Sequence, residues 1–347
     1  MTRSRQWLAT LVVVVLVAAG CGGGEDKTNV TTIGVLSAAL ADTAEASTYR
    51  VSLFVGSTFA LPAMGFESET GIDGQGPTMV GEISTEREHL VIDIGTMLEG
   101  LLGDIGDLGD LRLETWVDGE WIVMDTSSYQ RLADANPEVD LGPIAPGVFS
   151  IDLAAIGAES PELLRALVGS SPPDLSELAV SLPTALREIE QTSTSPQIFV
   201  GTAIYADLLA AQGIDVIDSA RSQAAGQALA QPISVDALTD FYVDFFENLD
   251  AEVVIELDER GLLRVFTTRA DMSDIFSKML DAEGLLPETS EQGRREAKEM
   301  FKDAVLVLET RSVYEADINL EVPLPPETTE DRTEQWRQFL IDAGFTG

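Results

Sequence analysis

The sequence predicts an α+β fold built on a large antiparallel sheet, and three observations lead to it. Apolar and polar residues alternate with a period of two over several segments near both ends of the chain, as in half-buried strands. Turn residues separate two pairs of such segments, which is typical of β-hairpins. Between these strand-rich parts the apolar spacing is helical. Strands and helices in separate blocks indicate the α+β class.

The chain begins with a short apolar run over residues 7–19. It is shorter than the roughly 20 residues that a membrane-spanning helix needs, and it follows two arginines and ends in small residues. This pattern predicts a signal peptide over residues 1–20. The sequence AAGC that ends at Cys21 resembles the lipobox of bacterial lipoproteins; the alternative is an ordinary signal peptide with a chance cysteine. We expect acylation of Cys21, a flexible glycine-rich tether over 21–34, and a lipid-anchored location on the extracytoplasmic side of the cell membrane.

The first strand-rich part follows the tether. Tyr49, Val51, Leu53 and Val55 fall on one face of a strand, because side chains alternate between the faces of a sheet. Asp118-Gly119 is a strong signal for a hairpin turn. The predicted elements are a helix over 35–47, strands over 49–56, 66–74, 79–85 and 89–95, and a hairpin over 111–126.

A helical stretch and a second strand-rich part complete the chain. We expect a helical insertion over about 127–200, including a helix that begins at Ser160 beside a proline. The remaining predicted elements are helices over 183–190, 206–212 and 235–248, a hairpin over 251–271 that turns at 258–261, a long strand within 304–325, and a final helix over 330–343. We expect residues 35–347 to form a single domain.

The order of these parts resembles the LppX/LprG-type actinobacterial lipoproteins, which belong with the LolA lipoprotein carriers. The resemblance rests on the lipobox, the first helix, "STYRVSLFVG", the "VDGEWIVMDT" hairpin, "SPELLRAL" and the hairpin "VVIELDERGLLRVFTT". It implies a strongly curved antiparallel sheet, a half-barrel, with helices covering the concave face. It also implies a cavity between them that holds lipid or acyl chains, and it carries no catalytic residues.

Composition limits the possible partners. The net charge of −38 repels nucleic acid, so we expect none as a partner. Cys21 is the only cysteine, so no disulfide stabilises the chain and burial alone must hold it together. The sequence does not predict an oligomeric state.

Candidate chemistry is sparse. His89 is the only histidine, which leaves little material for a Ser/His pair or a zinc site, and we expect it to have a structural place at a strand. Carboxylates are too numerous to single out a glycosidase pair. In "GDIGDLGDL", residues 103–111, the three aspartates at 104, 107 and 110 have the oxygen ligands that calcium prefers. The spacing fits no known calcium loop, and the alternatives are a glycine-rich connector, which we prefer, or a flap over a cavity mouth. We predict no enzyme activity, no cofactor and no metal.

The strand faces supply the candidate ligand site. Its residues are the inward-facing apolar side chains of two strands, Val51, Leu53, Val55, Val253, Ile255 and Leu257. Such residues suit a lipid cavity and a solid core equally well. The preferred function is therefore a lipoprotein that binds a lipid or acylated ligand and carries it within the cell envelope. The alternative is a non-enzymatic interaction lipoprotein with a filled core and an acidic docking face.

Overall fold

A computed structural model describes residues 27–342, apart from 73–75, 85, 97–110, 136–141, 160–174, 212–214, 218, 222–223, 225–233, 283–290 and 317. The strands are β1 (Thr48–Leu61), β2 (Phe66–Thr70), β3 (Met79–Ser84), β4 (Arg87–Asp93), β5 (Arg112–Asp118), β6 (Trp121–Asp125), β7 (Val148–Asp152), β8 (Leu186–Thr194), β9 (Gln197–Ile204), β10 (Asp250–Leu257), β11 (Leu263–Asp271), β12 (Val305–Ala316) and β13 (Glu330–Asp331). The α-helices are α2 (Lys27–Ala44), α4 (Gln130–Ala135), α5 (Leu153–Glu159), α7 (Leu175–Ala185), α8 (Tyr205–Ala211), α10 (Val235–Glu247), α11 (Ile275–Asp281), α12 (Glu291–Phe301) and α13 (Thr333–Asp342), and short 3-10 turns cover η1 (Pro62–Met64), η2 (Ser127–Tyr129) and η3 (Gly142–Ile144).

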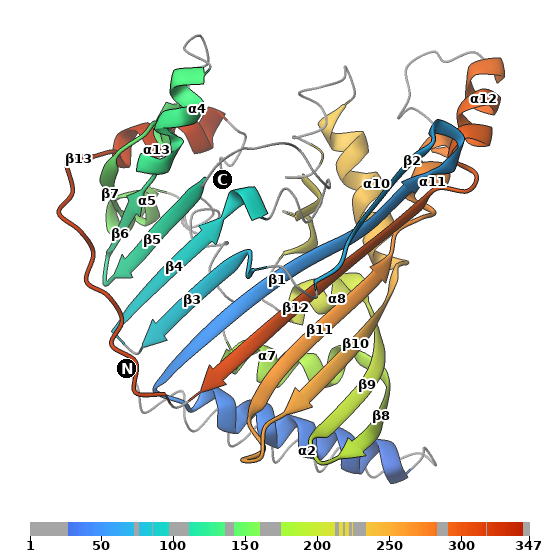
Figure 1. Ribbon diagram of the computed structural model, residues 1–347, viewed down its shortest axis with the longest axis horizontal. Helices are drawn as coiled ribbons and strands as arrows, with labels where there is room; N and C mark the ends of the chain where they lie inside the picture. Colours follow the sequence, from blue (N-terminus) through green and yellow to red (C-terminus); the bar gives the residue numbers. More distant parts are fainter. Residues whose placement is uncertain are drawn as a thin grey trace.

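Within the described ranges, thirteen strands form one mixed but mostly antiparallel sheet (Figure 1). Its order is β13-β7-β6-β5-β4-β3-β1-β12-β11-β10-β9-β8, with β2 added beside β1, and it is not closed. Only β13 and β7 pair in parallel. The predicted α+β class with a large antiparallel sheet is therefore confirmed.

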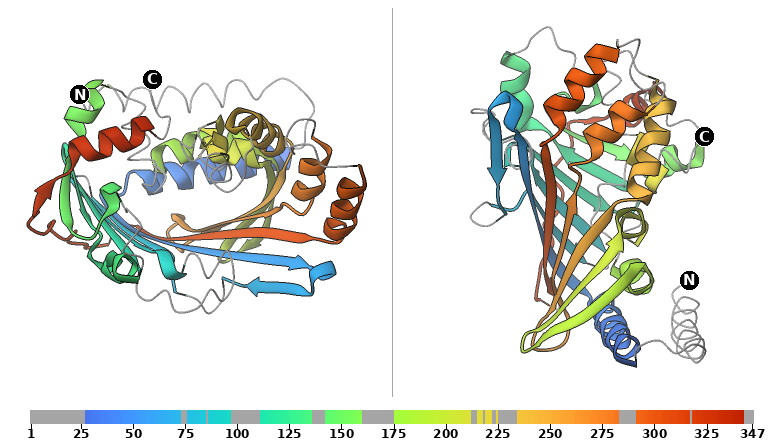
Figure 2. Two further views of the ribbon diagram at one scale, coloured as in Figure 1. Left: turned by 90° about the horizontal axis from the view of Figure 1, so that it is seen from above. Right: turned by 90° about the vertical axis from the view of Figure 1, so that its right-hand side faces the viewer.

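Both ends of the sheet bend toward the same side (Figure 2). Helices α2, α7 and α8 lie on that side, which we call the inner face. They pack on it because each helix has an apolar stripe along one side, and every second residue of the strands presents an apolar side chain to that stripe. Leu36 and Leu40 of α2 and Leu178 and Leu182 of α7 are at most 1% exposed and form one core cluster with inner-face residues of β8–β12.

A second, smaller cluster lies at the other end of the sheet. It joins Ile122, Met124, Phe149 and Ile151 of β6 and β7 to Ile156 of α5, and Trp336 of α13 packs against it. The inner face thus carries two packed regions. The larger one reaches Val51 of β1 and Ile83 of β3, whereas other inner-face residues of β1, β3 and β4 belong to neither region.

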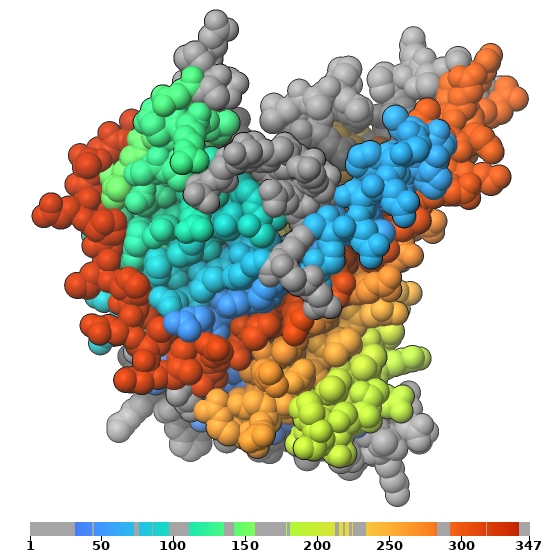
Figure 3. Space-filling view, viewed as in Figure 1, coloured from blue at the N-terminus to red at the C-terminus, as the bar shows by residue number. Residues whose placement is uncertain are grey.

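The final segment of the chain crosses from the sheet centre to its edge. It leaves β12 beside β1, where the Thr48 hydroxyl donates to the Ile318 carbonyl at 2.5 Å. It reaches β7 at Thr329, whose amide donates to the Val148 carbonyl at 2.8 Å. Arg332 then lies buried over the Phe149 ring at 4.2 Å. Figure 3 shows this segment, in red, along the side of the outer face of the sheet.

The turns of the two predicted hairpins differ in how closely they match the expectation. The β10–β11 turn lies at 258–261 as predicted, and Gly261 has a φ of +83°. The β5–β6 turn is displaced by one residue, because Asp118 pairs with Trp121 and leaves Gly119 and Glu120 as the loop. Gly119 has a φ of +64°, a conformation that costs other residues about 1–2 kcal/mol.

Three other predictions are wrong in part. Helix α2 begins at Lys27, so residues 27–34 are helical rather than a flexible tether. Buried Thr32 and the packing of Ile33 on the core explain this, because tertiary burial outweighs the weak helix propensity of β-branched residues.

The insertion over 127–200 is not mainly helical, since it contains β7, β8 and half of β9. The helix predicted over 183–190 ends at Ala185, and β8 follows at once. The residues that follow, LREIE, have good helix propensity, but pairing with β9 holds them extended and buries Leu186 and Ile189. The helix predicted at Ser160 lies outside the described residues.

Candidate functional site

The structure divides the six predicted ligand-site residues into two groups. Val253, Ile255 and Leu257 of β10, with Val51 of β1, are each 1% exposed. All four belong to the large core cluster under the helices. Water itself barely reaches them, so within the described structure they form a packed wall.

Leu53 and Val55 lie in a different environment. Both are half-buried, and neither belongs to a core cluster. Leu53 pairs with Met79 on β3, and Met79 pairs with Ile92 on β4. Ile92 in turn pairs with Leu113 of β5. These four apolar side chains stand next to one another on the inner face, because directly paired residues point to the same side of a sheet with Cβ atoms about 5 Å apart. We call Leu53, Met79, Ile92 and Leu113 the apolar row.

The apolar row lies between the two packed clusters. Leu113 contacts the smaller cluster, whereas Leu53, Met79 and Ile92 belong to neither. All four remain half-buried among the described residues. These half-buried apolar side chains on the concave face of the sheet still expose apolar surface to water. Removal of that surface from water is the driving force for binding a hydrophobic ligand.

Hydroxyl groups continue the inner face beyond the apolar row. Val55 pairs with Thr310 of β12, which pairs with Thr268 of β11. The hydroxyls of Thr268 and Thr310 share a hydrogen bond of 2.7 Å. One of these hydroxyls donates to the other, and this shared bond lowers the desolvation cost that the pair places on an apolar ligand beside Val55.

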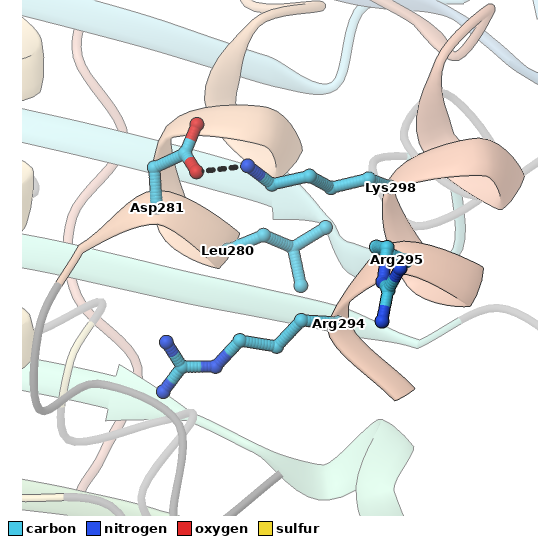
Figure 4. A pocket seen from close by; sticks show the side chains of 5 residues that line it. All are labelled: Leu280, Asp281, Arg294, Arg295 and Lys298. Atoms are coloured by element: carbon cyan, nitrogen blue, oxygen red, sulfur yellow. Dashed lines mark hydrogen bonds and ion pairs between the residues drawn. The ribbon is translucent and has the colours of Figure 1, made fainter. Parts of the chain in front are cut away.

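A pocket of about 410 Å³ lies between α11 and α12 (Figure 4). Leu280 and Asp281 line it from α11, and Arg294, Arg295 and Lys298 line it from α12. Lys298 forms an ion pair with Asp281. Nε of Arg294 is buried and makes no hydrogen bond within the described part of the chain.

This basic pocket was not predicted from the sequence, although its basic residues are close together there. The chain has only four lysines, and three of them, Lys278, Lys298 and Lys302, lie in or directly after α11 and α12. Adjacent Arg294 and Arg295 fall in the same stretch. Acidic residues are interspersed among these basic ones in the sequence. In the structure three of the basic side chains line one pocket with a single carboxylate, and such a place can hold an anion.

His89 has a structural place on the outer face of β4. Its ring stacks on Trp116 at 4.8 Å, and its side chain is 12% exposed. Nδ1 lies 3.5 Å from Glu82, and Nε2 lies 3.6 Å from Glu114. No nucleophilic side chain is among these contacts, which agrees with the structural place expected from the sequence.

Cys21 and the aspartates at 104, 107 and 110 lie outside the described residues. The acylation of Cys21 therefore stays a prediction, as do the alternatives for the 103–111 segment. Within the described ranges, no helix combines the length and the apolar character needed to cross a membrane.

Comparison with known proteins gives matches by structure alone. No family model matches the chain, and no curated protein matches its sequence. The fold is similar to the crystal structure of the Mycobacterium tuberculosis lipoprotein LppX, with 6% identity over 84% of this chain and 99% of that one, and a TM-score of 0.33. It is also similar to LprF from Mycobacterium bovis, with 8% identity over 86% of this chain and 98% of that one, and a TM-score of 0.33. LppX is also one of the proteins that name the family which the residues resemble.

Proposed function

We propose that this protein is an exported lipoprotein, anchored to the membrane by acyl chains on Cys21, that binds lipid or acyl chains and carries them within the cell envelope. The bent sheet acts as a half-barrel, and the ligand lies against its concave inner face. In this proposal residues 1–20 are removed, a short tether precedes α2, and the rest of the chain is one domain.

The apolar row carries the proposal. Leu53, Met79, Ile92 and Leu113 cross four strands of the inner face, stay half-buried and lie between two regions that are already packed. An acyl chain along this row would remove apolar surface from water at about 0.8 kcal/mol per buried methylene. About ten buried methylenes are enough to offset a binding cost of several kcal/mol from lost translation and rotation.

The six residues predicted from the sequence take different roles in this proposal. Leu53 and Val55 contact the ligand, and Met79 and Ile92 join them. Val51, Val253, Ile255 and Leu257 form the packed wall beside the ligand, since each is 1% exposed. No catalytic step is part of the proposal, and release follows from separation of the helices from the sheet.

The same packed wall favours the alternative function. Four of the six inward residues are buried in a closely packed cluster, as expected for a filled core. In that case the protein is a cell-envelope interaction lipoprotein, and its acidic outer face binds a partner. The two functions differ in whether the purified protein holds a hydrophobic ligand.

The test uses the mature chain with Cys21→Ser, which removes its own acyl chains. Native mass spectrometry and organic extraction report lipid that copurifies, and titration with the neutral fluorescent probe N-phenyl-1-naphthylamine reports free sites. We expect bound lipid or saturable probe binding. Leu53→Trp should weaken probe binding at least tenfold by filling the row, because tenfold corresponds to only about 1.4 kcal/mol.

Ser52→Trp is the matched control, because Ser52 is the neighbouring residue and points to the outer face. It should leave probe binding unchanged. A wild-type chain with no copurifying lipid and no saturable probe binding would favour the interaction lipoprotein instead.

A further inference from the structure

The pocket between α11 and α12 is lined mainly by basic side chains, which is unusual in so acidic a chain. The chain has a net charge of −38, yet two guanidinium groups and one ammonium group line a single pocket of about 410 Å³. Figure 4 shows Arg294 and Arg295 reaching out from α12 while Lys298 points to Asp281 on α11. Asp281 is the one acidic residue among the five that line the pocket.

Three carboxylates near the pocket interact with other residues. Asp281 is engaged by Lys298. Glu296 accepts a hydrogen bond from Gln292 at 2.8 Å, and Glu299 lies 3.6 Å from Lys302. Nε of Arg294 is buried without a hydrogen-bond partner among the described residues. A buried guanidinium nitrogen in this state is costly, and an anion in the pocket would satisfy it.

Apolar side chains, interrupted by buried Ser57 of β1, lie between the pocket and the apolar row. Leu280 lines the pocket and is 8% exposed, and Phe276, one turn earlier on α11, packs against the core. The Phe276 ring lies 6.2 Å from the ring of Phe59 on β1. Phe59, Val55 and Leu53 share the inner face of β1, because residues two apart on a strand point to the same side. From Phe59 to Leu53 the strand extends about 20 Å.

We propose that Arg294 and Arg295 bind the anionic headgroup of the lipid, a phosphate or a carboxylate, while its tail follows Phe276 and Phe59 to the apolar row. This inference rests on the proposed function and deepens it, because it assigns the ligand to the anionic amphiphiles. Arg is suited to the task, since its planar group can donate two parallel hydrogen bonds to phosphate or carboxylate.

The experiment compares lipids that differ only in the headgroup. Short-chain phosphatidylglycerol and the diacylglycerol with the same tails each compete with N-phenyl-1-naphthylamine on the mature Cys21→Ser chain, and the binding of inorganic phosphate is measured separately by isothermal titration calorimetry. We expect phosphatidylglycerol to bind about tenfold to a hundredfold more tightly than diacylglycerol, the range that a charge-assisted hydrogen bond supplies. Raising the salt concentration should reduce this preference.

The variant Arg294→Gln with Arg295→Gln should reduce the preference to less than about threefold and leave diacylglycerol binding unchanged. Lys302→Gln is the matched control, because it removes a positive charge just after α12 without touching the pocket. It should keep the full preference. Thermal unfolding of each variant shows whether it is folded, and Arg294→Lys with Arg295→Lys, which keeps both charges, should retain part of the preference.

Several outcomes would overturn the inference. Equal binding of diacylglycerol and phosphatidylglycerol by the wild type would do so while leaving the proposed lipid binding intact. A full preference in the double Gln variant, or its loss in Lys302→Gln, would also do so. Binding of inorganic phosphate as tight as that of phosphatidylglycerol would identify a free-anion site instead of a headgroup site. Failure of every lipid and of the probe to bind would remove the proposed function itself.

Discussion

Replacement of Ile255 by tryptophan tests whether the inner face under the helices is as full as its burial indicates. Ile255 is 1% exposed and pairs with Phe266 on one side and Phe199 on the other. Both rings are at most 4% exposed, so an indole has no free volume beside them. Overpacking of such a site lowers the free energy of unfolding by about 1–3 kcal/mol. We expect a loss near the upper end of this range for Ile255→Trp, because both aromatic neighbours are held in place by the core.

The matched variant is Leu53→Trp, at a half-buried position of the same inner face. Leu53 pairs with Met79, a flexible side chain, and with the small Ser312. Here the larger side chain should cost less than about 1 kcal/mol, because methionine adapts and the site is partly open. Urea unfolding followed by circular dichroism measures both changes. At about 2–4 °C per kcal/mol for a large domain, the melting temperatures of the two variants should differ by several degrees.

Equal losses of stability in Ile255→Trp and Leu53→Trp would refute this argument, because the two positions would then be packed alike. Unchanged stability in Ile255→Trp would refute it in the other direction. That result would mean that the helices cover a hollow at β10 and that the ligand lies there.

Three further predictions concern stability. Thr43→Val should cost about 1–3 kcal/mol of unfolding free energy, because the buried Thr43 hydroxyl accepts from the Leu263 amide at 2.8 Å and valine would leave that amide unpaired; urea unfolding measures it. Gly201→Ala should prevent stable folding, because a methyl group there would lie 2.3 Å from the backbone oxygen of Glu188; the yield of soluble protein and its thermal unfolding report the effect. Burial raises the pKa of Tyr314 to about 12, with a contact to Ser312 working against it. The folded state thus keeps the proton that the unfolded state loses near pH 10, and stability should fall as pH rises from about 10 to 12, by up to ~3 kcal/mol. Tyr314→Phe should remove most of that fall.

Matched variants separate these effects from general damage. Ser37→Ala, on the same helix as Thr43, removes a hydroxyl that bonds only within its own helix and should cost little. Gly71→Ala should be tolerated, because nothing lies within 4 Å of the added methyl group. If Gly201→Ala folds as well as Gly71→Ala, the close approach of β8 and β9 is not rigid. An alkaline stability loss that persists in full in Tyr314→Phe would assign it to the other buried tyrosines.

The sequence predicts those parts of the fold whose signals are local. The β10–β11 hairpin is predicted with its turn, because Asp258 and Gly261 specify the loop by themselves. Strand β8 is missed because LREIE has helical propensity, and only pairing with β9, a contact made in three dimensions, holds it extended.

In the candidate site too, the sequence predicts what local patterns determine and misses what depends on contacts between distant residues. Alternation correctly places Val51, Leu53 and Ile255 on the inner face. It does not separate the packed positions from the half-buried ones, because that depends on where the helices lie. The basic pocket is visible in the sequence only as a cluster of lysine and arginine, and its closure needs α11 and α12 to pack against each other.

The pairing of β1 with β12 has a consequence for how this protein folds. Tyr49 lies opposite Ala316 at the centre of the sheet, so the two strands that join its halves are far apart in the sequence. The strands β3–β7 and the strands β8–β11 can each form from nearby residues, and contacts between distant residues form slowly because of the entropy of closing a long loop. The central seam therefore cannot close until the chain has been made as far as β12. Until then the inner face stays open and apolar, which gives a partly made chain time to bind a chaperone or to aggregate.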